Sequence, residues 1–184
     1  LMEPEEVAEA FDRLHAAGKV RAFGVSNHHP MQIELLSKYL HQKLIINQLQ
    51  LSLTNTTMID AGLNVNMENA QAVNRDGGVL EYCRLKGITI QAWSPLQFGF
   101  FEGVFLDHER FPELNEKLGE MAEKNGVTKS AVAIAWILRH PARIQPIVGT
   151  TNPARLRDIC RASQVSLTRK EWYDLYKAAG KTLP

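Results

Sequence analysis

Polar side chains and one tryptophan stand at the ends of short apolar runs in this 184-residue chain. The first run ends at Ser26 and Asn27, the second at Gln48 and the third at Trp93. Serine, asparagine and glutamine both donate and accept hydrogen bonds, which is the chemistry needed to hold a carboxamide by its edges. An indole beside them could stack on a flat ring. Taken singly, the polar residues are equally typical of turn caps, and a tryptophan is more often part of a hydrophobic core.

A fourth run leads into Gly149 to Asp158, a segment with the composition of an anion site. Asn152 and Pro153 predict the N-cap and first position of a helix. Arg155 then lies in the first turn, where the helix dipole disfavours a cation. Unpaired backbone amides, hydroxyl groups and a guanidinium in one place would suit a phosphate. A surface arginine that covers a helix end is the alternative, with equal weight from spacing alone.

Helices and strands that alternate along the chain would bring these four run ends together. Strands are expected at Val20–Val25, Leu44–Gln48, Ile88–Trp93 and Ile144–Val148. Helices are expected before Gly18, from Pro30, at Val79–Lys86, before Gly126, from Thr128 to His140, from Pro153, and from a capping box at Thr168–Glu171. Strands separated by helices predict a parallel sheet covered by helices, in which sites form at the carboxyl ends of strands.

Alternation within the third run decides where its tryptophan points. One face would carry Ile88, Ile90 and Ala92, and the other Thr89, Gln91 and Trp93. If the first set packs on helices, the tryptophan points into the mouth of the sheet. The connection 49–78 is rich in Asn and Thr and is expected to be a long loop, either functional or disordered.

Composition and charge narrow the class of protein. Hydrophobic residues at 45%, charged residues at 22% and a formal net charge of +1 are ordinary for a globular protein and favour neither nucleic acid nor acidic partners. The longest apolar run, Ala131–Leu138, is too short to cross a bilayer, so no membrane association is expected. Cys83 and Cys160 lack metal-type spacing and are expected to be reduced, half-buried thiols in a cytoplasmic protein.

Histidines are the other candidates for chemistry. His28 and His29 follow a strand end, but no acidic or cysteine partner stands at useful spacing. We therefore assign them neither a catalytic nor a metal-binding role. His29 is expected to cap the helix that begins at Pro30, and His28 is a candidate to line a pocket.

Four segments, in this order, resemble the aldo-keto reductase family in its bacterial type: Gly18–Asn27, Asn47–Gln48, Ala92–Leu96 and Gly149–Asp158. The resemblance covers nearly the whole chain and implies an α/β fold, the (β/α)8 TIM barrel, that binds NADP(H) without a Rossmann domain. It implies that residues 1–184 are the C-terminal part of one such domain, carrying about strands 5–8, with strands 1–4 absent. A complete four-stranded α/β domain is the alternative that length alone allows, since a whole barrel needs about 250 residues.

The resemblance also assigns cofactor contacts by position. From the nicotinamide to the adenine end, these are Ser26, Asn27 and Gln48 at the carboxamide, Trp93 on the ring, Ser94 and Leu96 at the pyrophosphate, Thr150 and Arg155 at the 2′-phosphate, and Asp158 at the adenine amine. Two departures from the family pattern stand beside them. Ile159 replaces a second adenine-contacting amide, which implies looser adenine binding. Gln97–Phe100 replaces a glycine-richer loop, which leaves the clasp over the pyrophosphate undetermined.

The implied activity is the NADPH-dependent reduction of an aldehyde or ketone to an alcohol. The family's catalytic aspartate, tyrosine, lysine and histidine come from the first half of the barrel, so none is assigned here, and the chain alone is expected to be inactive. A half barrel is also expected to expose two strand edges and an apolar interior. Two other classes stay open, a non-catalytic NADP-binding regulatory subunit and a structural half-barrel. The partner would be a small-molecule carbonyl substrate, and the sequence indicates neither its identity nor an oligomeric state.

Overall fold

The computed structural model describes residues 2–183, in which helices and strands alternate. The α-helices are α1 Pro4–Ala16, α2 Pro30–Ser37, α3 Thr57–Leu63, α4 Val79–Lys86, α5 Pro112–Asn125, α6 Lys129–Leu138, α7 Pro153–Cys160 and α8 Arg169–Ala178. Two 3-10 helices are η1 Ala70–Ala72 and η2 Arg161–Gln164. The strands are β1 Phe23–Ser26, β2 Leu44–Gln50, β3 Thr89–Trp93, β4 Gln97–Phe98, β5 Gly103–Val104 and β6 Gln145–Pro146.

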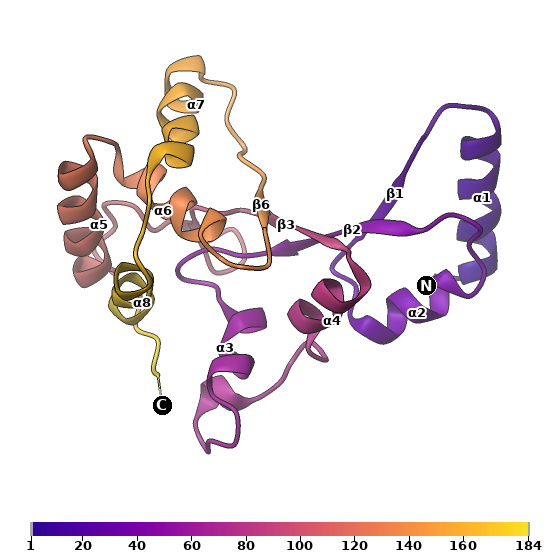
Figure 1. The fold of residues 1–184 in the computed structure, drawn as a ribbon, viewed down its shortest axis with the longest axis horizontal. Coiled ribbons are helices and arrows are strands. Elements are labelled where there is room, and N and C mark those ends of the chain that lie inside the picture. Colours follow the sequence, from indigo (N-terminus) through magenta and orange to yellow (C-terminus); the bar gives the residue numbers. More distant parts are fainter. Residues whose placement is uncertain (1, 184) are drawn as a thin grey trace.

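One parallel sheet connects the two sides of the molecule, as predicted. Its strands lie in the order β1-β2-β3-β6, so the chain crosses the sheet in one direction (Figure 1). Helices α1 and α2 lie beside β1, and α5 to α8 gather at the β6 side. Within the described residues β1 pairs only with β2, and β6 only with β3, so both outer strands have an unpaired side.

The two faces of the sheet have different surroundings, as the alternation predicted. Ile90 and Ala92 are buried on one face, whereas Gln91 and Trp93 of the same strand are half-buried on the other. The Gln91 and Trp93 side chains therefore share the less buried face of the sheet.

A row of polar side chains crosses that second face. The register aligns Ser26, Gln48, Gln91 and Gln145. The Gln48 Nε2 donates to Gln91 Oε1 at 3.1 Å, and the Gln91 Nε2 donates to Gln145 Oε1 at 3.0 Å. The expectation of an apolar interior is wrong for this row, because neighbouring amides satisfy one another and tolerate contact with water.

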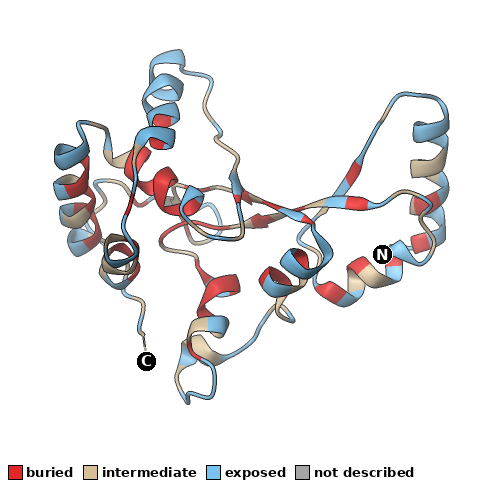
Figure 2. Ribbon diagram, in the orientation of Figure 1, coloured by how far each residue is buried: buried red, intermediate tan, exposed pale blue. Residues whose placement is uncertain are grey.

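Part of the core lies where α6 and α8 meet through their tryptophans. Every residue from Ala131 to Ile137 is buried, as Figure 2 shows for α6. The Trp136 and Trp172 rings stack with 4.7 Å between centroids. Both tryptophans are buried and belong to the core. The predicted capping box of α8 is also present, with Thr168 and Glu171 bonded to each other's backbone.

The connection 49–78 is more ordered than the sequence indicated. It contains α3 and η1, and it buries Met58 and Ile59 against the core. Asp60 is also buried, and its carboxylate accepts a hydrogen bond from the Tyr176 hydroxyl at 2.8 Å. The prediction of a long loop was wrong, because this tertiary contact with α8 stabilises a helix that is too short to be recognised from its own sequence.

The observed strand boundaries differ from the predicted ones, most of all in β1, β2 and β6. β1 begins at Phe23 instead of Val20, and β2 continues past Gln48 to Gln50. The fourth strand is only Gln145–Pro146, shorter than the predicted Ile144–Val148, although the Ile147 N–H beyond it still donates to the Ala92 carbonyl oxygen at 2.9 Å. The short hairpin β4–β5 was not predicted.

The two cysteines have opposite environments. Cys83 is fully buried, and this burial raises the pKa of its thiol to about 11. Cys160 is exposed at the end of α7, so the prediction that both thiols are half-buried was wrong. Across residues 2–183, no helix combines the length and apolar character needed to cross a membrane. No group of three His, Cys, Asp or Glu side chains within that range is placed to hold a metal ion.

Candidate functional site

A cavity of about 280 Å³ opens between the end of β3, the β4–β5 hairpin and the start of α7. Five of the nine residues predicted to contact a cofactor line it: Trp93, Ser94, Leu96, Thr150 and Arg155. They come from two segments separated by about fifty positions in sequence. The fold thus brings the predicted ring-stacking, pyrophosphate and 2′-phosphate residues to one cavity, which we call the β3–α7 cleft.

Trp93 joins this cleft to a second, larger cavity of about 450 Å³. The second cavity lies between the turn after β1 and the connection 49–78, and we call it the β1–β2 cavity. Most of its lining is polar: Asn27, His28, His29, Gln32, Gln50, Asn55, Thr57, Arg75 and Asp76. The Trp93 Nε1 donates to the Asn27 Oδ1 at 3.2 Å, and this bond fixes the indole at the boundary between the two cavities.

The turn after β1 is held against the neighbouring strand. The Ser26 Oγ and the Asn27 backbone N–H both donate to the Gln48 carbonyl oxygen, each at 3.0 Å. Asn27 has a φ of 53°, in the left-handed region that asparagine tolerates better than most residues. Gly24 allows the close approach of β1, because a Cβ there would lie 2.7 Å from the Ile46 Cβ.

Asn47 is a positioning residue that the sequence reading named but did not assign. It is fully buried, and its Nδ2 donates to the His28 carbonyl oxygen at 2.7 Å. Its Oδ1 accepts from the His28 backbone N–H at 3.5 Å. An asparagine that directly follows the apolar run 44–46 of a strand is itself a signal, because a buried amide must find partners. Here it holds the turn that carries Ser26 and Asn27.

The remaining hydrogen-bonding capacity at this turn matches a carboxamide. Asn27 uses its Oδ1 for Trp93, which leaves the Nδ2 as a donor. Gln48 uses its Nε2 for Gln91, which leaves the Oε1 as an acceptor. A primary carboxamide offers one acceptor oxygen and two donor hydrogens, so a free donor on Asn27 and a free acceptor on Gln48 are complementary to it. Of these two residues, only Asn27 lines one of the cavities.

The start of α7 differs in one respect from the predicted anion site. The Asn152 Oδ1 accepts from the backbone N–H groups of Ala154 and Arg155 at 2.9 and 3.2 Å. The predicted N-cap and helix start are confirmed, but the expectation that amides at this helix end are free is wrong for these two groups, because the cap occupies them. The exposed guanidinium of Arg155 and the hydroxyl of Thr150 carry the anion-binding capacity instead.

The adenine end of the predicted site is divided between two neighbouring residues of α7. Asp158 is exposed and does not line the cleft. Ile159 lines it and is only 4% exposed. Arg155 and Ile159 are four residues apart and share a helix face, whereas Asp158 projects from the adjoining one. The cleft therefore ends on an apolar surface.

The β4–β5 hairpin places two exposed phenylalanines beside Trp93. Phe101 stacks on the indole with 6.0 Å between centroids, and Phe100 meets it edge-on at 6.4 Å. The hairpin is anchored by Gln50, whose Nε2 donates to the Gly99 carbonyl oxygen at 2.7 Å. Phe100 and Phe101 are 75% and 65% exposed. Neighbouring apolar rings that are exposed to water are typical of a surface that contacts a ligand or partner.

The four tyrosines lie away from both cavities, so the site contains no phenol to donate a proton. The Tyr82 hydroxyl donates to Glu34 at 2.7 Å, and burial together with this contact raises its pKa. Burial and the bond to Asp60 likewise raise the pKa of Tyr176. Tyr39 and Tyr173 also line neither cavity.

The comparisons with known proteins all point to the same family. The model of the family described as "Aldo/keto reductase family" matches residues 2–179. A 6-dehydroglucose reductase of Agrobacterium fabrum is 37% identical over 180 residues, which are 97% of this chain and 53% of that protein. A 6-dehydroglucose reductase of Novosphingobium aromaticivorans is 34% identical, over 100% of this chain and 55% of its own length. The chain thus spans about half the length of these relatives.

A solved structure gives the same result for the fold. The aldose reductase of Giardia lamblia superimposes with a TM-score of 0.71 at 19% identity, over 100% of this chain and 53% of that one. At this identity the likeness concerns the fold, namely a parallel sheet with helices around it.

Proposed function

The chain belongs to the aldo/keto reductase family, and from this we propose that it forms the cofactor-binding part of an NADPH-dependent carbonyl reductase. The complete protein would reduce an aldehyde or ketone to an alcohol. The observation that carries the proposal is the β3–α7 cleft, in which Trp93, Ser94, Leu96, Thr150 and Arg155 meet. We further propose that β1, β2, β3 and β6 are strands 5–8 of a (β/α)8 barrel, and that the protein is cytoplasmic.

The nicotinamide end of NADPH would lie at the boundary of the two cavities. The free Asn27 Nδ2 would donate to the carboxamide oxygen, and the free Gln48 Oε1 would accept from its nitrogen. The Ser26 Oγ donates to the Gln48 carbonyl and keeps its acceptor capacity for the same group. With Trp93 against the ring, these contacts fix which face of the nicotinamide is presented to a substrate.

The phosphate end would lie at α7. The Arg155 guanidinium would bind the 2′-phosphate as a charge-assisted, two-pronged donor, with the Thr150 hydroxyl beside it. NADH lacks this phosphate, so the same pair would favour NADPH. Ser94, with a φ of 50°, and Leu96 would face the pyrophosphate between the two ends.

NADPH supplies the hydride in such a reduction, and the residues of this chain bind and orient it. The proton for the carbonyl oxygen needs a general acid in reach of the substrate. None of the tyrosines described here lines the β3–α7 cleft or the β1–β2 cavity. We therefore propose that the general acid and its supporting residues come from outside these 184 residues.

The substrate we propose is a small, hydroxyl-bearing carbonyl compound. The β1–β2 cavity supports this, because amide, hydroxyl and imidazole side chains line it next to Trp93. Such groups form hydrogen bonds with the hydroxyl groups of a substrate, which replace those that the substrate loses to water when it binds. Two relatives named 6-dehydroglucose reductase are in keeping with a polar substrate.

The proposal is tested by comparing residues 1–184 with the full-length protein. The full-length protein should oxidise NADPH when a reactive aldehyde is added. The chain alone should not, and its unpaired β1 and β6 edges should make it molten, aggregated or dimerised edge to edge. Mass measurement in solution and an NADPH oxidation assay give both results. A monomeric chain with a turnover of about 10 s⁻¹, typical of whole enzymes, would contradict the division of roles.

A further inference from the structure

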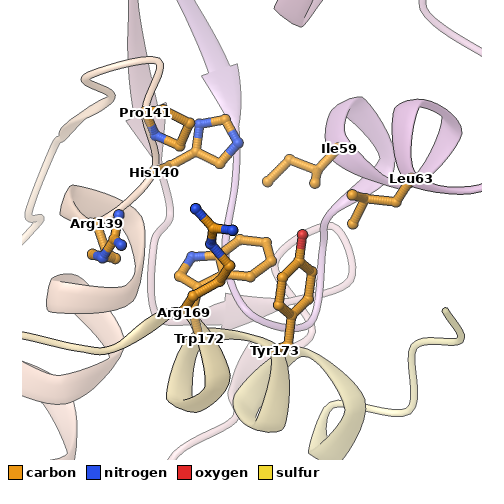
Figure 3. Close-up of a pocket in the computed structure, with 8 residues that line it drawn as sticks. All are labelled: Ile59, Leu63, Arg139, His140, Pro141, Arg169, Trp172 and Tyr173. Carbon is orange, nitrogen blue, oxygen red and sulfur yellow. The ribbon is translucent and has the colours of Figure 1, made fainter.

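A third cavity, of about 310 Å³, lies between α3, the end of α6 and the start of α8. None of its lining residues lines the β3–α7 cleft or the β1–β2 cavity. Figure 3 shows Arg139, His140 and Arg169 on one side of it, with Ile59 and Leu63 of α3 on the opposite side. Its size falls at the lower end of the range for small-molecule sites, about 300–1,000 Å³. We call it the α3–α8 pocket.

The floor of this pocket is apolar and rigid. Trp172 stacks on Trp136 at 10° between planes, and each indole N–H donates to the other residue's carbonyl oxygen at 3.0 Å. Tyr176 stacks on the same indole and bonds to Asp60 of α3. Because these contacts fix α8 against both α6 and α3, the pocket is preformed and its aromatic floor needs no rearrangement to receive a ligand.

The rim carries positive charge that no carboxylate balances. Arg139 donates through Nε to the Leu167 carbonyl oxygen at 2.8 Å, which leaves its two Nη groups available as donors. The Arg169 side chain lines the pocket, and it makes no hydrogen bond and no ion pair among residues 2–183. Neither guanidinium has a carboxylate oxygen within 4.0 Å among the residues described. Arg169 also occupies the first turn of α8, where the helix dipole disfavours a cation.

The other polar groups of the pocket are donors as well. Burial and the charge of Arg84 lower the pKa of His140 to about 4, so this imidazole is neutral at pH 7. Its Nδ1 accepts from the Ala142 backbone N–H at 3.2 Å, which places the proton on Nε2. The Tyr173 hydroxyl also lines the pocket. Two guanidiniums, an imidazole N–H and a phenol O–H therefore surround an apolar floor.

From this arrangement we propose that the α3–α8 pocket is a second ligand site, which binds a small organic carboxylate with an aromatic or aliphatic body. The body lies on Trp172, Ile59 and Leu63, and the carboxylate is held by Arg139 and Arg169. A planar guanidinium matches a planar carboxylate in shape and hydrogen bonding. The apolar floor adds favourable contact with an apolar body, which a simple inorganic anion lacks. The inference is independent of the proposed reductase activity.

The test uses full-length protein and 2-naphthoate as the probe, with uncharged 2-naphthamide for comparison. Calorimetric titration should show saturable binding of 2-naphthoate and much weaker binding of the amide. Arg169→Gln should weaken 2-naphthoate about ten- to a hundredfold, as expected for a lost charge-assisted contact. Arg161→Gln is the matched control, since Arg161 is exposed beyond α7 and lines no part of the pocket; it should leave the affinity unchanged. Circular dichroism establishes that both variants fold.

Three outcomes would overturn the proposal. One is the absence of saturable 2-naphthoate binding to the wild-type protein. Another is an equal loss in the Arg161→Gln control or in Arg155→Ala, which would place the probe in the cofactor cleft or on the general surface. The third is inorganic phosphate binding as tightly as 2-naphthoate, since the apolar floor would then contribute nothing.

Discussion

The three tryptophans of the chain occupy two contrasting regions. Trp136 and Trp172 are buried between α6 and α8, and each uses its indole N–H on the other's backbone. Trp93 is half-buried at a strand end, where its N–H bonds to the Asn27 side chain at the boundary of two cavities.

The difference shows how to separate a structural aromatic residue from one that is available for binding. The pair on α6 and α8 closes its hydrogen bonds within itself, so neither indole N–H is left to bind a ligand. The partner of Trp93 is a side chain that keeps a free donor, and further polar groups follow it on both sides. Mutation in the first region should therefore lower mainly the stability of the fold, whereas mutation at Trp93 should lower mainly the affinity for the coenzyme.

The largest effect is expected from Trp172→Ala. Removing a buried tryptophan typically costs about 3–5 kcal/mol, and this one also removes the indole N–H that donates to the Trp136 carbonyl oxygen. Urea unfolding of the full-length protein measures the loss. Trp93→Ala should cost far less stability, so equal shifts in the unfolding midpoint would remove the distinction between the two regions.

Arg155→Ala should have the next largest effect, on affinity. Loss of a charge-assisted contact to the 2′-phosphate should weaken NADPH binding about ten- to a hundredfold, and NADH binding much less. A fluorescence titration with each coenzyme measures this. Arg157→Ala on the same helix is the control, because Arg157 is exposed and does not line the cleft. Equal losses for both coenzymes would show that Arg155 does not contact the 2′-phosphate.

Trp93→Ala should have a smaller effect on affinity and a distinct optical one. Stacking contributes roughly 0.5–1.5 kcal/mol, so NADPH binding should weaken about two- to tenfold. Nicotinamide binding should quench part of the tryptophan fluorescence, and that part should vanish in the variant. If the full quench persists, the ring does not stack on Trp93, and the aromatic pair on α6 and α8 is closer to the cofactor than we propose.

The smallest effect concerns the edge of the tryptophan core, at Glu171. Its contacts with Lys124 and with Thr168 lower the pKa of its carboxyl to about 2. Because the folded pKa lies below the ordinary value near 4.5, the carboxylate stabilises the fold above that pH, and this contribution is lost as the pH falls toward 2.

Glu171→Gln retains the capping geometry and removes the charge, so it should cost about 0.2–1 kcal/mol at pH 7. The difference from wild type should shrink as the pH is lowered. Denaturant midpoints between pH 7 and pH 2.5 give the comparison. A difference that stays constant over this range would mean that the Lys124 contact contributes nothing to stability.

Much of this fold could be read from the sequence because its signals are local. Alternation in β3 predicted which face carries Trp93, and the caps at Asn152 and Thr168 were recognised from side chains that bond within their own first turn. The residues assigned to the cofactor by family resemblance converge in one cleft, apart from those at the nicotinamide end and Asp158. Their cofactor roles stay predictions.

The features that could not be predicted from the sequence depend on contacts between residues far apart along the chain. The helix α3 forms because Tyr176, more than a hundred positions later, bonds to Asp60. The buried partner of the turn after β1 is Asn47 on the next strand, and the glutamine row exists only because three strands align in register. The Asn152 side chain, and not a bound anion, accepts from the first backbone N–H groups of α7. Its orientation decides this, and composition does not specify that orientation. Sequence alone therefore determined most of the elements and the chemistry they carry. The tertiary structure decided which donors and acceptors remain free, because hydrogen bonds form between whichever groups the fold brings within reach.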